Sequence, residues 1–128
     1  MSAKPTHRLG RLQLQIMKVL WHRREATVAQ VLEAVRAEAE LAYTTIATML
    51  RKMEDKGLVE HRVFNRSYIY RASVTEEAVT KSMANDLIDR LFEGSLSDMV
   101  SHLLTNREIT DDELSSLEEM IQSKRSEK

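Results

Sequence analysis

The 128-residue chain contains no cysteine, one proline and three glycines. Without cysteine it has neither disulfides nor thiolate metal ligands, and with so few glycines it lacks the Gly-rich loops that bind nucleotide phosphates. No apolar run approaches the roughly 20 residues of a membrane helix, and the N-terminal residues lack the apolar core of a signal peptide. These absences exclude a transmembrane role and argue against nucleotide-dependent chemistry. We expect a cytoplasmic protein rich in helix.

Charge is distributed unevenly along the chain, although its formal net value is only −1. Residues 1–73 carry 13 Lys and Arg against 7 Asp and Glu, a net charge of +6. Residues 74–128 carry 6 against 13, a net charge of −7. A basic first half beside an acidic second half indicates that only the first half faces a polyanion. The alternative is that two helical halves simply differ in surface charge.

Apolar residues at helical spacing predict three helices in the first half. These helices are expected over about residues 9–22, 28–38 and 43–56. Thr27 and Gln30 form a capping-box pattern at the start of the second helix, and Gly57 follows the third where a left-handed cap is favourable.

The sequence then changes to a period of two, with β-branched and aromatic residues that predict a β-hairpin over about 58–72. Asn65, in the expected turn, tolerates a positive φ. Three helices followed by a hairpin is the order of a winged helix-turn-helix domain, with the hairpin as the wing. The predicted fold is therefore mainly α with a small β-hairpin wing, and the predicted DNA-binding domain covers residues 1–73.

Residues 74–128 show only helical patterns, with Thr75 and Thr110 at expected helix starts and a charged tail from Ser123 that is expected to fray. Three helices with wide apolar stripes have few ways to bury them, so we predict a C-terminal helical dimerisation domain. The alternative is a monomer in which these helices fold back on the first domain. The apolar positions predicted to support dimerisation are Leu87, Leu91, Phe92, Met99, Val100, Leu103, Leu114, Leu117 and Ile121.

One face of the helix expected over 43–56 is suited to DNA. Its apolar stripe is Ile46, Met49, Leu50 and Met53, which leaves a polar face opposite at about 100° per residue. Threonines are small enough for a helix to enter a major groove about 12 Å wide, and Arg and Lys reach guanine edges or phosphates. The side chains predicted to contact DNA from this helix are Tyr43, Thr44, Thr45, Thr48, Arg51 and Lys52. The alternatives are an ordinary solvated face and, for Tyr43, a place in the core.

The expected wing carries Arg62, Arg66 and Arg71, a basic strip suited to phosphate or minor-groove contact with strong salt dependence. Phe64, near the turn, is a candidate anchor for it. The four histidines are scattered at positions 7, 22, 61 and 102, without the spacing of metal ligands, and are read as structural or exposed. Residues 111–113 are read as the acidic first turn of a helix. We therefore predict no metal site, no cofactor and no enzymatic activity.

The ordered combination of several segments resembles the BlaI/MecI/CopY group of bacterial repressors, from about Leu9 to Ile121. The segments that carry the resemblance are 9–10, 16–21 (IMKVLW), 41–50 (LAYTTIATML), 56–59 (KGLV) and 68–71 (YIYR). The resemblance implies a winged-helix homodimer with intertwined C-terminal helices. It also implies repression through dyad-symmetric operators with TACA/TGTA-type half-sites.

The resemblance further implies how repression is relieved. In the β-lactam-response members, a membrane sensor metalloprotease system causes cleavage between an Asn and a Phe in the dimerisation region. Alignment on Gly94 and the following helix places His102 and Leu103 at that bond, so a related protease would need a different specificity. Copper-responsive members use a C-terminal cysteine cluster, which this chain lacks.

Two other classes of function compete with a repressor. The first is a ligand-sensing winged-helix regulator of the PadR or MarR kind, with an effector pocket among the C-terminal helices. Phe92 is the one aromatic residue in that half, so few side chains are available to line a pocket for an aromatic effector. The second is a protein-interaction module whose wing binds an acidic partner.

Overall fold

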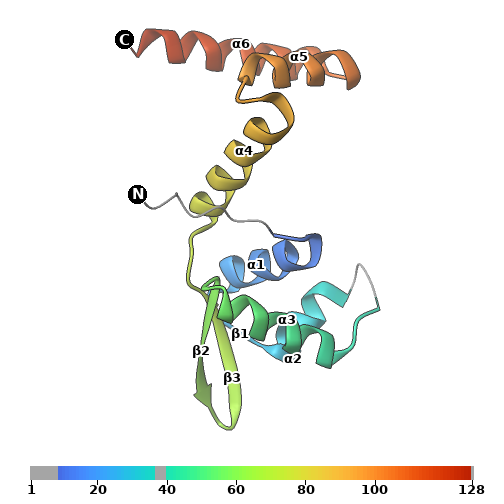
Figure 1. Cartoon of the computed structure of the whole chain (residues 1–128), viewed down its shortest axis with the longest axis vertical. Coiled ribbons are helices and arrows are strands. Elements are labelled where there is room, and N and C mark those ends of the chain that lie inside the picture. Colours follow the sequence, from blue (N-terminus) through green and yellow to red (C-terminus); the bar gives the residue numbers. More distant parts are fainter. Residues whose placement is uncertain (1–8, 37–39, 128) are drawn as a thin grey trace. The chain divides into compact units, whose positions relative to one another are not determined.

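A computed structural model describes residues 9–36 and 40–127 of the chain (Figure 1). Contacts between Cα atoms divide the chain into two compact units, and the boundary in the sequence lies between Asp86 and Leu87. We call the part before this point unit 1 and the part after it unit 2, and describe each by itself. None of the described helices is both long and apolar enough to cross a membrane.

Before the start of a fourth helix, unit 1 has three helices and a three-stranded antiparallel sheet, as a winged helix-turn-helix domain requires. The helices are α1 (Arg11–Arg23), α2 (Val28–Val35) and α3 (Tyr43–Asp55). The strands are β1 (Ala26–Thr27), β2 (Val59–Phe64) and β3 (Ser67–Ala72), in the sheet order β1-β3-β2. The predicted helices and hairpin are confirmed, while the end predicted for the second helix lies outside the described residues. The short strand β1, which pairs with β3, was not predicted because two residues show no periodicity.

Local signals in the sequence explain where these elements begin and end. The Thr27 side chain accepts a hydrogen bond from the Gln30 amide at 3.2 Å, and the Gln30 side chain accepts one from the Thr27 amide at 2.9 Å. This capping box starts α2. Gly57, at φ +80°, reverses the chain after α3 and leads directly into the wing.

The wing is a hairpin in which β2 and β3 project from the helices (Figure 1). Both residues of its turn have positive φ, 49° for Asn65 and 65° for Arg66. A two-residue turn of this kind matches the right-handed twist of the strands. The positive φ of Asn65 is as predicted, whereas that of Arg66 was not.

The core of unit 1 is apolar and lies between the three helices and one face of the sheet. Ile16, Leu20, Ile46 and Leu50 are among its fully buried side chains, and no described polar or charged residue is buried. The chain after the wing remains attached to this unit, because the Trp21 indole donates a 2.9 Å hydrogen bond to the Val74 carbonyl.

The helix α4 (Glu76–Phe92) begins within unit 1, where Val79 is buried. The Thr75 hydroxyl accepts a hydrogen bond from the Ala78 amide at 3.1 Å and so caps its first turn, as predicted. A division into functional domains after residue 73 stays a prediction.

Unit 2 contains the end of α4 together with α5 (Leu96–Asn106) and α6 (Asp111–Ser126). Ser95 and Thr110 cap α5 and α6 by accepting hydrogen bonds from backbone amides at 3.1 Å. The prediction that the tail frays from Ser123 is wrong, since α6 continues to Ser126. Its last turn contains Lys124 and Arg125, whose charges stabilise a helix C-terminus.

Candidate nucleic-acid interface

The exposed face of α3 carries the polar side chains that the sequence predicted. Ile46, Leu50 and Met53 are fully buried, while Met49 is only half-buried. Every predicted contact residue of this helix is exposed, namely Tyr43, Thr44, Thr45, Thr48, Arg51 and Lys52. Burial of one stripe in the core of unit 1 therefore fixes which side of α3 faces solvent.

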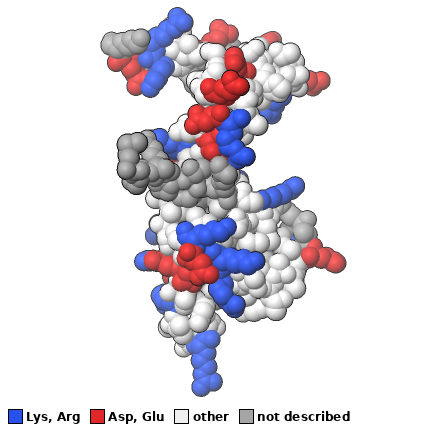
Figure 2. Space-filling model, in the orientation of Figure 1, with Lys and Arg blue, Asp and Glu red and all other residues white. Residues whose placement is uncertain are grey.

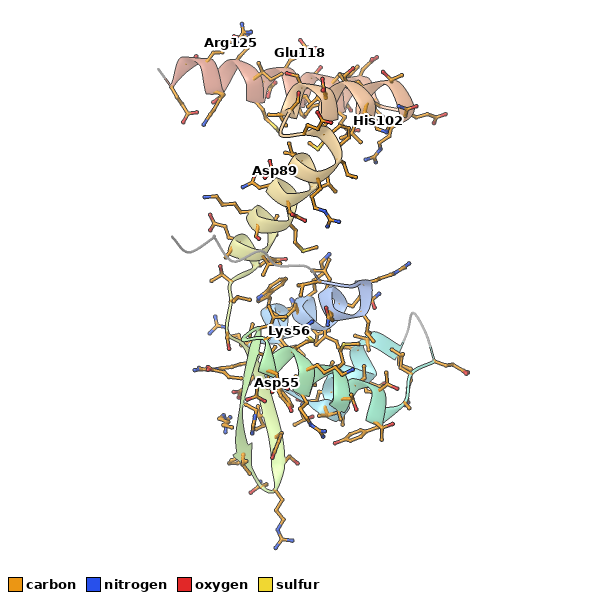
Figure 3. All side chains as sticks on the ribbon, viewed as in Figure 1. Asp55, Lys56, Asp89, His102, Glu118 and Arg125 are labelled. Carbon is orange, nitrogen blue, oxygen red and sulfur yellow. The ribbon has the colours of Figure 1, made fainter. Side chains whose placement is uncertain are left out.

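The middle of this face forms a shallow, open groove rather than a closed pocket. Its lining residues are Thr44, Thr45, Thr48, Met49 and Lys52. The threonine side chains are short, which leaves the backbone of α3 accessible to a groove of DNA. Ala42, at the N-cap, supplies no side-chain acceptor for the amides of the first turn. Figure 3 shows Asp55 at the opposite end of the helix, next to Lys56.

Tyr43 and Phe64 are both exposed, by 54% and 55% respectively. The core alternative for Tyr43 is therefore wrong, and its phenol is available at the start of α3. Phe64 lies under the guanidinium of Arg62, whose Cζ is 5.7 Å from the ring centroid. This is the geometry of a cation–π contact, so the aromatic ring supports an arginine and is not buried beneath the turn.

The three wing arginines, which the sequence treated alike, have different surroundings. The Arg62 guanidinium donates to the Glu25 carboxylate at 3.0 Å, and Arg71 forms an ion pair with Glu60. Arg66 lies in the turn itself and makes no ion pair with any described residue. Figure 2 shows basic side chains at the tip of the hairpin and acidic ones among basic ones nearer its base.

Sequence reasoning missed the two acidic partners. Glu60 and Arg71 are directly opposite each other in the register of β2 and β3, so pairing the two strands in sequence would have found that contact. Glu25 precedes β1, which the sequence did not reveal, so its approach to Arg62 depends on the tertiary fold.

A second polar cluster, also missed, joins α3 to the inner face of the wing. His61 Nδ1 lies 2.7 and 2.8 Å from the two carboxylate oxygens of Glu54. The imidazole stacks on Tyr68 with ring centroids 4.0 Å apart, and Tyr70 lies beneath at 5.5 Å. Burial, and next the negative charge of Glu54, raise the pKa of Tyr70 above its ordinary value of 10.0.

The histidines and acidic side chains have these surroundings in the structure. Over residues 9–36 and 40–127, no three His, Asp or Glu side chains gather as metal ligands would. His7 lies outside the described residues. His61 is half-buried against Glu54, and His102 lies on α5 with its ring 5.8 Å from that of Phe92 (Figure 3).

The apolar residues predicted to support dimerisation occur on all three helices of unit 2. Leu87, Leu91 and Phe92 belong to α4, Met99, Val100 and Leu103 to α5, and Leu114, Leu117 and Ile121 to α6. Phe92 and Met99 are half-buried, and the others are exposed within the single chain. No residue of α5 or α6 is buried. Unit 2 therefore presents an extensive apolar surface.

Comparison with known proteins gives a family match over nearly the whole chain. The family model described as penicillinase repressor matches residues 9–123. A penicillinase repressor of Bacillus licheniformis is 23% identical over 116 residues, which are 91% of each chain. The methicillin resistance regulatory protein MecI of Staphylococcus aureus is 18% identical over 93% of this chain and 97% of its own length. A transcriptional regulator BlaI of Mycobacterium tuberculosis is 44% identical over 64 residues, 49% of this chain and 46% of its own.

Solved structures show the same fold. The DNA-binding domain of the repressor BlaI, in solution, has a TM-score of 0.50 and 24% identity, and covers 58% of this chain and 90% of its own. A MarR mutant from E. coli has a TM-score of 0.55 and 16% identity, and covers 90% of this chain and 76% of its own. The winged-helix prediction is confirmed.

Proposed function

The chain belongs to the penicillinase repressor family of DNA-binding transcriptional repressors, and we propose that it acts as a homodimer on a dyad-symmetric operator in the cytoplasm. Each protomer inserts α3 into a major groove and lays its wing along the neighbouring backbone. Two-fold symmetry then sets the half-sites about 34 Å, or a multiple of it, apart. The resemblance to the BlaI/MecI/CopY group favours half-sites of the TACA/TGTA type.

The observation that carries this proposal is the exposed face of α3 together with a wing whose turn carries Arg66, which makes no ion pair with any described residue. The threonine hydroxyls and methyls can meet phosphates, base edges and thymine methyl groups, while Arg51 and Lys52 reach guanine edges or phosphates. Arg66 supplies a charge for the backbone from the turn of the wing. Base contacts from α3 provide specificity, and phosphate contacts from the wing fix the register.

Gel-shift titration on palindromes with TACA/TGTA half-sites tests the assignment of α3. Thr45→Ala with Lys52→Ala should abolish preference for the palindrome over a scrambled duplex, because both side chains lie on the exposed face. A matched control is Thr80→Ala with Lys81→Ala, which makes the same chemical changes on the exposed surface of α4. If the α3 variant still prefers the palindrome over the scrambled duplex as the unaltered chain does, the assignment of α3 is wrong.

Dimerisation through unit 2 is supported by its apolar surface. Side chains such as Leu91, which is 68% exposed, have too few neighbours within one chain to be buried. Exposed apolar area of this extent is typical of an interface between subunits. A second copy presents the same surface, so a two-fold arrangement covers both.

Relief of repression by proteolysis in unit 2, through a membrane sensor protease, is the mechanism that the family resemblance favours. The bond between His102 and Leu103 lies within α5 (Figure 3). Proteases bind extended substrate, so cleavage there requires local unwinding of this helix. Mass spectrometry of the chain from induced cells tests this point, and a chain that stays intact on induction would exclude it.

A ligand-sensing function of the MarR kind is less favoured by the geometry of unit 2. The concavity on α6 is an open groove along one helix, lined by Ser115, Glu118, Glu119, Ile121 and Gln122. Small-molecule effectors bind in enclosed and mostly apolar pockets. The groove on α6 is open along its length, so it lacks the enclosure that such a pocket needs.

A further inference from the structure

The base of the wing packs in the core through Val59 and Tyr70, but its backbone pairing with the rest of unit 1 is short. Strand β3 pairs with β1 over only two residues, Ala26 opposite Tyr70 and Thr27 opposite Ile69. A two-stranded hairpin is marginally stable by itself, so its position relative to α3 must be fixed by side chains. The outer half of the hairpin is exposed on both faces, including Val63 and Phe64.

The contact between His61 and Glu54 lies where such a fixing point is needed. Glu54 belongs to the last turn of α3 and His61 to the third position of β2, so the hydrogen bond joins the recognition helix to the wing. The two side chains are 27% and 30% exposed, which shields the contact from water in part. Stacking on Tyr68 of β3 fixes the imidazole ring as well, so both strands of the wing are held.

The same contact involves a negative charge on the helix that carries the proposed DNA surface. Glu54 follows Arg51 by three residues on α3, and both charges act on the hydroxyl of Tyr70. Without a donor on His61, the Glu54 carboxylate would be free to turn toward Arg51 and to compete with DNA phosphates for that charge. Repulsion between that carboxylate and DNA would add to the loss of wing position.

From these contacts we propose that His61 and Glu54 are positioning residues, which hold the wing against α3 so that Arg66 meets the DNA backbone while α3 occupies the groove. The proposal rests on the proposed function and adds to it a specific coupling. DNA contact by Arg66 depends on a hydrogen bond at the other end of the hairpin. Neither residue is required to touch DNA.

A double-mutant cycle on the full chain tests the coupling. His61→Phe keeps an aromatic ring for Tyr68 and removes the donor, whereas His61→Asn keeps a donor close to the position of Nδ1. Each is measured alone and with Arg66→Ala, by titration of a palindromic duplex. We expect His61→Phe and Arg66→Ala each to weaken binding by about tenfold, and the double variant to be no weaker than either, because coupled residues are not additive. His61→Asn should restore most of the affinity.

Three other results would count against the proposal, each in its own way. If the two losses multiply to about a hundredfold in the double variant, the wing contact is real but independent of His61, and only the positioning role falls. If His61→Asn binds as weakly as His61→Phe, the hydrogen bond has no role. If Arg66→Ala binds like the unaltered chain, the wing contact of the proposed function is wrong and the positioning role falls with it. Should His61→Phe fail to fold, Glu54→Met, which removes the acceptor from the other side of the same contact, enters the same cycle.

Discussion

The three wing arginines should contribute differently to DNA binding, and replacing each one by alanine measures the difference. Arg66 makes no ion pair with the described residues, so it neutralises a phosphate without losing a partner. Arg62 must release or share Glu25, 3.0 Å away, and Arg71 must do the same with Glu60. We therefore expect Arg66→Ala to reduce the salt dependence of binding more than either other replacement.

The magnitude follows from the number of phosphates that each variant no longer neutralises. A homodimer has two wings, and each lost phosphate contact lowers the slope of log affinity against log salt by about 0.9, so Arg66→Ala lowers it by about 1.8. Over a fourfold rise from about 50 to about 200 mM salt, a slope of 1.8 corresponds to about twelvefold in affinity. For Arg62→Ala we expect less than half of that slope change, because the Glu25 carboxylate already compensates the charge.

Fluorescence anisotropy of a labelled palindrome at several salt concentrations measures these slopes directly. Lys81→Ala is the control, since it removes one exposed positive charge from α4, outside the proposed interface. Glu25→Gln is the reciprocal variant, which should raise both the affinity and the slope by freeing Arg62. Exposed ion pairs contribute only about 0–1 kcal/mol to stability, so all these variants should remain folded. Equal slope changes for Arg62→Ala and Arg66→Ala would refute the assignment of different roles.

Three further variants probe the core, the dimer and the buried tyrosine. Leu50→Ala, at a fully buried position of α3, should lower the free energy of unfolding by about 2–5 kcal/mol, measured by chemical denaturation. Leu117→Glu should shift the sedimentation coefficient from dimer to monomer, because it places a charge on the apolar surface of α6, and a coefficient that stays at the dimer value would count against unit 2 as the interface. Above about pH 10 the unfolded chain releases the tyrosine proton that folded Tyr70 retains, so stability should fall as pH rises through that range. Tyr70→Phe should remove part of this fall, seen in melting temperatures measured between pH 8 and pH 11.

The elements of unit 1 were predictable because each carries a local signal that the tertiary structure does not override. The capping box at Thr27 needs only residues three apart, and the left-handed cap at Gly57 needs only one. The exposed face of α3 followed from its apolar stripe by helical geometry alone. Only the half-burial of Met49 departed from that pattern.

The polar contacts around the wing were not predictable, since they depend on where strands and helices meet. Glu25 and Arg62 are 37 residues apart, and their contact needs the unpredicted strand β1. His61 and Glu54 are close in sequence, but the turn at Gly57 brings a strand residue back onto a helix, which periodicity does not describe. Counting charges in the sequence shows that residues 1–73 are basic. It does not show that two of the wing arginines form ion pairs with Glu25 and Glu60.

That pairing leaves each wing with one arginine, Arg66, that makes no ion pair with the described residues, which limits what one protomer of the proposed dimer can contribute to binding. With a half-site dissociation constant of about 10 µM, within the range of non-specific binding, one unit 1 alone would occupy its site poorly. If unit 2 links two copies with an effective concentration of about 1 mM, the palindrome binds at about 0.1 µM, a hundredfold tighter than one half-site. Any event that separates the two copies, such as Leu117→Glu or cleavage within α5, then costs about a hundredfold on the palindrome and nothing on a single half-site. Equal losses on both duplexes would show instead that unit 2 acts on the fold of unit 1.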